Sequence, residues 1–246
     1  MRRRPSRELL DDDLGSPEEV AASLEDLWFL NRRFGVLRNY ESLLRQAIAG
    51  MPAGSGAISW LEAGAGSGRT ADWIGRTLQN SGLAVRPYLM DRKWTHFESA
   101  FRRRIGPAAF TELRPVAADI TQAPFAPQSF DLVSCSLLLH HFSGEAALEL
   151  LRSLADLARH ALVVLDLERA WPPYVFMHLL RPWFRSRLTR NDAPASFRQA
   201  YSRDEMHELA LAAGFEKEKL RVTQLRPANL GLIYMKHGLR SGISIA

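Results

Sequence analysis

The sequence predicts an α/β fold: a doubly wound, mostly parallel seven-stranded Rossmann-like sheet with an N-terminal helical cap and a helical lid insertion. From about residue 57 onward, short apolar runs alternate with helical patterns, which is typical of a parallel sheet. A glycine-rich turn joins the first apolar run to the first helix of this series, and acidic residues close several of the runs. The 246 residues are enough for one such domain with a modest appendage.

The beginning of the chain predicts helices rather than strands. Residues 1–15 are highly charged, and we expect them to be frayed. The capping box Ser16-Pro17-Glu18-Glu19 then starts a helix that should run to Phe34, with proline at its first position. A second helix is expected over residues 37–51. We therefore assign residues 1–52 to a helical cap.

Residues 53–246 form the predicted ligand-binding domain. Strands are expected at 57–62, 86–90, 111–116, 130–136, 161–166, 219–224 and 231–236, and helices at 70–81, 95–104, 145–157 and 203–213. Residues 167–202 break this rhythm and form the expected lid. Within it, Trp171-Pro172-Pro173 should stop the chain, residues 174–188 should form an apolar helix, and residues 190–201 should form a loop.

Composition and charge narrow the class of protein. No apolar run reaches the roughly 18 residues that a transmembrane helix needs. The only cysteine, Cys135, excludes an internal disulfide, and the first residues lack the apolar stretch of a secretory signal, so we expect a cytoplasmic protein. The net charge is +5, and most of the basic residues are arginines. Such a surface attracts nucleic acid, anionic lipid or an acidic substrate, unless it is merely solvated.

The most informative motif lies between residues 60 and 70. Gly64, Gly66 and Gly68 alternate with small residues directly after a strand that ends near Glu62. Glycine permits the backbone angles of a sharp strand-to-helix turn and lets a ligand approach the main chain closely. Asp91 closes the next apolar run, at about the distance expected for a carboxylate that binds ribose. The motif therefore predicts a nucleoside site.

Residues 57–236 resemble the class I S-adenosylmethionine-dependent methyltransferases, and Glu62–Gly68 resembles their first motif. The resemblance implies S-adenosylmethionine as cofactor. The implied cofactor-binding residues are Glu62, Gly64, Ala65, Gly66, Gly68, Asp91, Arg92, Asp119, Ile120, Ser136 and Leu137. In that family an acid such as Asp91 binds the ribose hydroxyls. Asp119 would meet the adenine amino group and Ile120 would pack on the ring, while Glu62 would orient the loop or reach the methionine ammonium. For each residue taken alone, the structural alternative is a helix N-cap for Asp91 and a turn residue for Asp119.

Residues 130–142 resemble the fourth strand of this family and its exit, which faces the transferable methyl group. Enzymes that methylate base nitrogens carry an Asn/Asp-Pro-Pro-aromatic run here, and cytosine-C5 methylation needs a Pro-Cys nucleophile. The sequence Ser134-Cys135-Ser136-Leu137 fits neither pattern. A small-molecule acceptor is therefore favoured, and no stable nucleic-acid partner is expected.

His140 and His141 are the candidate catalytic residues. A phenol or enol acceptor must lose a proton, and histidine titrates in the appropriate range. The alternative is that the pair only caps or packs the turn. No metal is expected, because two adjacent histidines point apart on regular backbone and no carboxylate pair flanks them at ligand spacing.

The lid insertion carries a large apolar surface beside four arginines. The apolar residues are Tyr174, Val175, Phe176, Leu179, Leu180, Trp183 and Phe184, and the arginines are Arg181, Arg185, Arg187 and Arg190. Three interpretations are open: a pocket for a lipophilic acceptor, reversible contact with an anionic membrane surface, or an amphipathic helix packed on its own domain.

The segments Asn31–Gly35, Asp166–Arg169 and 190–201 resemble a bacterial subgroup that accompanies type III polyketide synthases. Those enzymes act on small, lipophilic, hydroxylated products, which implies O-methylation of a phenol, enol or pyrone-like hydroxyl. An RNA or protein methyltransferase, an NAD-dependent oxidoreductase and a non-catalytic nucleoside-binding protein remain alternatives. The sequence does not determine the oligomeric state.

Overall fold

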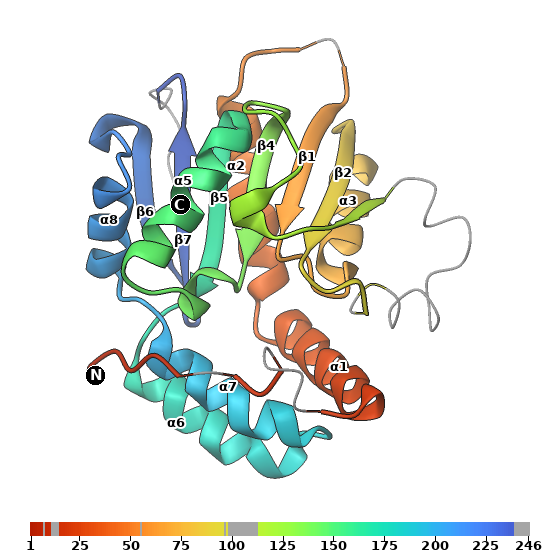
Figure 1. Cartoon of the computed structure of the whole chain (residues 1–246), viewed down its shortest axis with the longest axis vertical. Coiled ribbons are helices and arrows are strands. Elements are labelled where there is room, and N and C mark those ends of the chain that lie inside the picture. Colours follow the sequence, from red (N-terminus) through yellow and green to blue (C-terminus); the bar gives the residue numbers. More distant parts are fainter. Residues whose placement is uncertain (7, 11–14, 55, 96, 98–112, 239–246) are drawn as a thin grey trace.

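One seven-stranded sheet forms the centre of the molecule (Figure 1). The computed structural model describes residues 1–6, 8–10, 15–54, 56–95, 97 and 113–238. The strands are β1 (Ile58–Ala63), β2 (Val85–Asp91), β3 (Arg114–Ala117), β4 (Phe130–Ser136), β5 (Ala158–Leu167), β6 (Leu220–Leu225) and β7 (Asn229–Met235). Their order across the sheet is β3-β2-β1-β4-β5-β7-β6. Strands β1 to β5 are parallel and β7 is antiparallel to β5 and β6, which confirms the predicted fold class.

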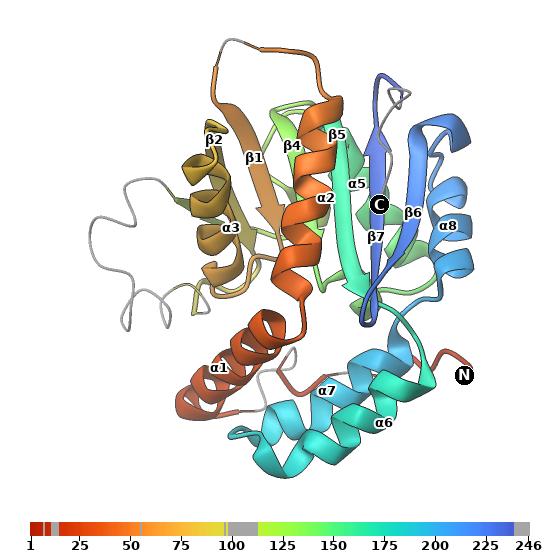
Figure 2. The same ribbon diagram turned by 180° about the vertical axis from the view of Figure 1, so that it is seen from behind.

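Helices cover both faces of this sheet. The helices are α1 (Pro17–Arg33), α2 (Val36–Gly50), α3 (Arg69–Asn80), α5 (Glu145–Leu157), α6 (Trp171–Leu180), α7 (Arg187–Gln199) and α8 (Arg203–Ala212). Figure 2 shows α2 and α3 in front of the sheet, whereas Figure 1 shows α5 on the opposite face. Because strand side chains alternate between faces, Trp60 packs with α2 and α3, and Leu61 packs with α5 and α8.

The two N-terminal helices have different neighbours. The capping box of α1 is present: the Ser16 hydroxyl accepts from the Glu19 amide and the Glu19 carboxylate accepts from the Ser16 amide. Helix α2 contributes buried side chains such as Leu43 to the core against the sheet, whereas α1 packs against α7. The assignment of residues 1–52 to an N-terminal helical cap stays a prediction.

A layer of helices lies beyond the carboxyl ends of the parallel strands (Figures 1 and 2). It consists of α1, α6 and α7, with α6 outermost. Its small core is formed by Leu30, Met177, Phe184, Ala193, Phe197 and Ala228. Open parallel sheets bind ligands at the carboxyl ends of their strands, so this layer covers the expected site.

The lid insertion differs from the prediction in three places. Trp171-Pro172-Pro173 does not stop the chain but begins α6, because the first turn of a helix has no partner for the amide hydrogen that proline lacks. The expected apolar helix ends at Leu180 rather than at residue 188. Residues 190–201, expected as loop, lie mostly in α7 despite the internal Pro194. One face of α7 is buried, so tertiary packing outweighs the local preference for a turn.

The first residues are not frayed where the structure describes them. The Arg4 amide donates to the Arg198 carbonyl at 3.0 Å, and the amides of Leu9 and Leu10 each donate to the Asp192 carboxylate at 3.0 Å. The prediction was wrong for these residues because α7 supplies hydrogen-bond partners that no local pattern reveals.

Two expected elements fall at the edge of the described residues. Most of the predicted helix at 95–104 lies outside them. The strand predicted at 111–116 is observed as β3, Arg114–Ala117. Among the described helices, none combines the length and the apolar character that crossing a bilayer requires.

Candidate active site

A cavity of about 570 Å³ lies between the carboxyl ends of β1, β2 and β4 and the layer of α1, α6 and α7. Predicted cofactor residues that line it are Gly64, Ala65, Gly66, Asp91, Arg92, Asp119, Ile120, Ser136 and Leu137. The cavity wall also includes His140 and His141, but neither Glu62 nor Gly68. The volume lies within the range of roughly 300 to 1,000 Å³ that is usual for small-molecule sites.

The glycine-rich turn presents bare backbone to this cavity. Gly64, Gly66 and Gly68 have φ of +66°, +54° and +73°, the left-handed region that favours glycine. A Cβ on Gly66 would meet no atom within 4 Å, whereas a Cβ on Gly64 would lie 2.9 Å from the side chain of Leu138. The open space at Gly66 is therefore available to a ligand. Gly68 instead caps the N-terminus of α3 and supports the turn.

Asp91 ties the end of β2 to the glycine-rich turn. Its Oδ2 accepts a hydrogen bond from the Gly66 amide at 2.7 Å, and its Oδ1 accepts from the Lys93 amide at 2.9 Å. A carboxylate offers about four lone-pair positions, so both oxygens can still accept hydroxyl donors from the cavity. The same group can thus shape the turn and bind a ligand.

Asp119 caps a short turn at the wall of the cavity. It is the N-cap of the short 3₁₀ helix η1 (Ile120–Gln122), and its Oδ1 accepts from the amide and the hydroxyl of Thr121 at 2.9 and 2.8 Å. These hydrogen bonds, helped by the charge of Arg92, lower the pKa of Asp119, so its carboxylate stays ionised. It also lines the cavity beside Ile120.

Glu62 lies beneath the cavity wall in a shell of hydroxyl groups. Its carboxylate accepts hydrogen bonds from Tyr40 on α2, from Ser134 at 2.6 Å and from Ser136 at 2.9 Å. Burial raises the pKa of Glu62 to about 7, although the hydrogen bonds from these three hydroxyls act in the opposite direction. Ser136 lines the cavity and Glu62 does not, so Ser136 lies between Glu62 and the cavity.

The chain is strained where β4 ends. Leu137 has φ of +55°, which is uncommon for a residue other than glycine. Its amide donates to the Leu165 carbonyl at 2.8 Å, which holds the turn in place. This conformation costs on the order of 1 kcal/mol. The strained turn directs the chain into η2 (Leu139–His141), which carries both histidines.

The two histidines have different surroundings. His140 is buried; its Nδ1 lies 2.6 Å from Asp166 Oδ1, and its amide donates to Asp166 Oδ2 at 2.8 Å. Burial alone would lower the pKa of His140, but the carboxylates of Asp166 and Glu8 raise it to about 10. His140 is therefore an imidazolium at neutral pH. The side chain of His141 is 21% exposed and faces the cavity.

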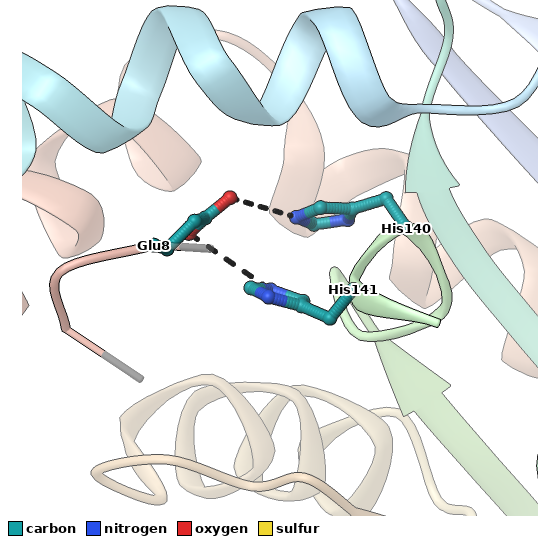
Figure 3. Close-up of side chains that lie close together, drawn as sticks. All are labelled: Glu8, His140 and His141. Atoms are coloured by element: carbon teal, nitrogen blue, oxygen red, sulfur yellow. Dashed lines mark ion pairs between the residues drawn. The ribbon is translucent and has the colours of Figure 1, made fainter. Parts of the chain in front are cut away.

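Glu8 reaches both histidines from the N-terminal segment (Figure 3). Its Oε1 lies 3.7 Å from His140 Nε2, and its Oε2 lies 4.0 Å from His141 Nε2. The hydroxyl of Ser196 and the side-chain amide of Gln199, both on α7, donate to Glu8 Oε1 at 2.5 and 2.6 Å. Burial raises the pKa of Glu8, but the two histidines and Ser196 outweigh it, and the net shift is downward.

These three side chains also form a possible set of metal ligands. Donor atoms of Glu8, His140 and His141 all lie within 4.8 Å of one another. The expectation that the adjacent histidines point apart was wrong: in the 3₁₀ turn their ring centroids lie 4.2 Å apart with 33° between the ring planes. Because His140 pairs with the carboxylates of Asp166 and Glu8, ion pairs also account for the close approach of these side chains. The expected absence of a metal stays a prediction.

Comparison with protein families decides the class of protein. The family model described as a methyltransferase domain matches residues 28–220. The chain belongs to this methyltransferase family. The match confirms the predicted class I S-adenosylmethionine-dependent methyltransferase, whereas the association with polyketide synthases stays a prediction. No curated protein sequence matches the chain significantly.

Solved methyltransferase structures share the fold. A S-adenosylmethionine-dependent methyltransferase from Aquifex aeolicus aligns with a TM-score of 0.61 at 16% identity, over 90% of this chain and 98% of its own. The plantazolicin methyltransferase BpumL, in complex with S-adenosylhomocysteine, aligns with a TM-score of 0.59 at 13% identity, over 88% and 95%. Magnesium protoporphyrin IX methyltransferase from Synechocystis PCC 6803, with bound S-adenosylmethionine, aligns with a TM-score of 0.53 at 16% identity, over 82% and 79%.

Sequence reasoning missed several residues of this methyltransferase site. Tyr40 lies within the helix predicted at residues 37–51, where nothing marked it as a site residue, yet its hydroxyl donates to Glu62. Asp166 ends an apolar run at the carboxyl edge of the sheet, and that position was a usable signal. The sequence does not identify Glu8 as a site residue, because nothing distinguishes it from the other charged residues near the N-terminus.

Proposed function

We propose that this methyltransferase transfers a methyl group from S-adenosylmethionine to a hydroxyl of a small, lipophilic acceptor such as a phenol, enol or pyrone. One observation carries the proposal: the same cavity is lined by the glycine-rich turn at one end and by apolar side chains of the helical layer at the other. The histidine pair lies on the wall of this cavity.

The residues present fit the donor. The open space at Gly66 would admit the methionyl part and the ribose, and Asp91 would accept hydrogen bonds from the ribose hydroxyls. Asp119 would accept from the adenine amino group and Ile120 would pack on the ring. Ser136, held by Glu62, would face the methionyl end. When bound, the sulfonium supplies an activated methyl group, so the enzyme mainly has to align an in-line displacement.

His141 is the residue that we assign to proton transfer. The imidazole of His141 would accept the proton of the acceptor hydroxyl, so that this oxygen could take the methyl group. The bound sulfonium would supply that methyl group and would keep the electron pair of its C–S bond. His140 is held as an imidazolium between the carboxylates of Asp166 and Glu8, and its ring lies against that of His141 with centroids 4.2 Å apart. In this proposal it supports the ring of His141 and does not accept the proton.

The acceptor would occupy the apolar half of the cavity. Leu27 and Leu30 from α1 and Phe34 directly after it line this half, together with Met177 from α6 and Phe197 from α7. These side chains give a wall without charge, which suits a hydrocarbon chain or an aromatic ring.

The decisive experiment incubates the protein with isotopically labelled S-adenosylmethionine and a panel of lipophilic phenols and hydroxypyrones, with products identified by mass spectrometry. We expect a labelled methyl ether, and we expect His141→Asn to lower kcat about 100-fold while affinity for S-adenosylhomocysteine is unchanged. Labelling of RNA or protein only would favour those alternatives. Cofactor binding without any methylation would favour a non-catalytic role.

We also propose the cytoplasmic location that the lone Cys135, buried in β4, supports.

A further inference from the structure

An exposed apolar face runs along α6 on the outside of the helical layer. It consists of Trp171, Val175, Phe176, Leu179 and Trp183, and we call it the α6 surface. Their exposed fractions are 59%, 48%, 41%, 64% and 74%, whereas Met177 is the buried residue of this helix. Three of these residues are spaced four apart, so they lie along one side of the helix. Helix α6 does pack on its own domain through Met177 and its contact with α7, but this packing leaves these five side chains exposed.

The segment that carries the α6 surface has basic residues but no acidic ones. Residues 170–191 contain four arginines and no aspartate or glutamate. Arg181, Arg185, Arg187 and Arg190 are all exposed, next to Trp183 or in the first turn of α7. Arg187 also pairs with Glu19 of α1 at 3.1 Å. Exposed tryptophan and leucine side chains next to several arginines are typical of a helix that lies in a membrane interface.

We propose that the α6 surface docks on an anionic lipid bilayer, with Leu179 and Trp183 inserted at the level of the headgroups. A second copy of the chain is a poorer occupant, because a two-fold contact places the same surface on both sides. It would bring the arginines of residues 170–191 against those of the partner copy, with no acid in the segment to pair with them. The proposal concerns a surface, so it is independent of the proposed reaction.

Docking would place the cavity next to the bilayer. Met177 lines the cavity from the inner side of α6, one residue away from the exposed Phe176. Phe34, which also lines the cavity, contacts Phe176 edge to face with ring centroids 5.4 Å apart. The Phe34–Phe176 pair thus connects the wall of the cavity with the α6 surface. If the proposed function holds, a lipophilic acceptor can pass between bilayer and cavity at this point.

The test is co-sedimentation of the protein with vesicles, without cofactor or acceptor. One set is phosphatidylcholine alone and the other is an equal mixture of phosphatidylcholine and phosphatidylglycerol. We expect binding to the mixed vesicles that weakens with salt. Arg181→Gln with Arg185→Gln should weaken it about 30-fold, since each basic residue near an anionic surface contributes about fivefold. Leu179→Ser with Trp183→Ser should weaken it at least about tenfold.

Matched controls lie elsewhere on the surface. Arg86→Gln with Arg152→Gln removes the same charge from exposed positions on β2 and α5, and Leu211→Ser removes an exposed apolar side chain from α8. Both controls should bind vesicles like the wild type, and every variant should bind S-adenosylhomocysteine normally. The proposal is overturned if the wild type ignores mixed vesicles, if both sets of variants lose binding equally, or if the α6 variants only dissociate a dimer or release an acidic protein.

Discussion

Glu62 provides a quantitative test of the cofactor half of the site. Its carboxyl group is buried, and its pKa is raised from 4.5 to about 7. The folded state therefore binds this proton more tightly than the unfolded chain does. The contribution of the group to stability is fully present below pH 4.5 and is lost as the pH rises through 7. A pKa difference of this size corresponds to about 2 to 3 kcal/mol between pH 5 and 8.

Glu62→Gln removes the titration while it keeps the size of the side chain. We expect the free energy of unfolding of the wild type to fall by about 2 to 3 kcal/mol more than that of the variant between pH 5 and 8. Urea unfolding at several pH values measures the difference in slope. Equal slopes in both proteins would mean that Glu62 is ionised throughout this range, and the account of its burial would be wrong.

Three further predictions concern the loop, the ion pair and the metal. Gly66→Ala should weaken S-adenosylhomocysteine binding about tenfold by calorimetry, because its Cβ enters the open space of the cavity; Gly82→Ala, also at positive φ with open space, should leave binding unchanged. Asp166→Asn should lower the pKa of His140, measured by NMR of the ring nitrogens, and should destabilise the fold by about 3 kcal/mol, because it leaves a buried charge short of a partner. Dialysis against EDTA should not change kcat, and a loss restored by one divalent metal would assign Glu8 and the histidines as its ligands.

The sheet and the cofactor half of the cavity were accessible from sequence because their signals are local. Gly64 and Gly66 lie in the turn after β1 and Asp91 is the last residue of β2, and parallel strands bring their carboxyl ends together. No tertiary information is needed to place such residues on one edge of the sheet. The burial of Glu62 among hydroxyl groups was not accessible, because Tyr40 reaches it from a helix that precedes the sheet.

The lid was predicted less well because local preferences compete with packing there. Pro172 and Pro173 signal a break as readily as the first turn of a helix, and only the contact of α6 with α7 decides between them. By its local preference Pro194 also favours a loop, but it is buried within α7. Sequence periodicity alone does not reveal which side of such a helix is covered.

The acceptor half of the site depends on contacts between distant parts of the chain. Ser196 and Gln199 on α7 hold Glu8, and Glu8 in turn faces His141 next to β4. The surroundings of the proposed base are thus assembled from three segments that meet only in the folded protein. The glycine-rich turn, by contrast, is shaped by its own backbone and by Asp91. Substitutions in the lid can therefore change which acceptor is bound and how its proton is removed, while the half of the cavity that would hold the donor stays intact.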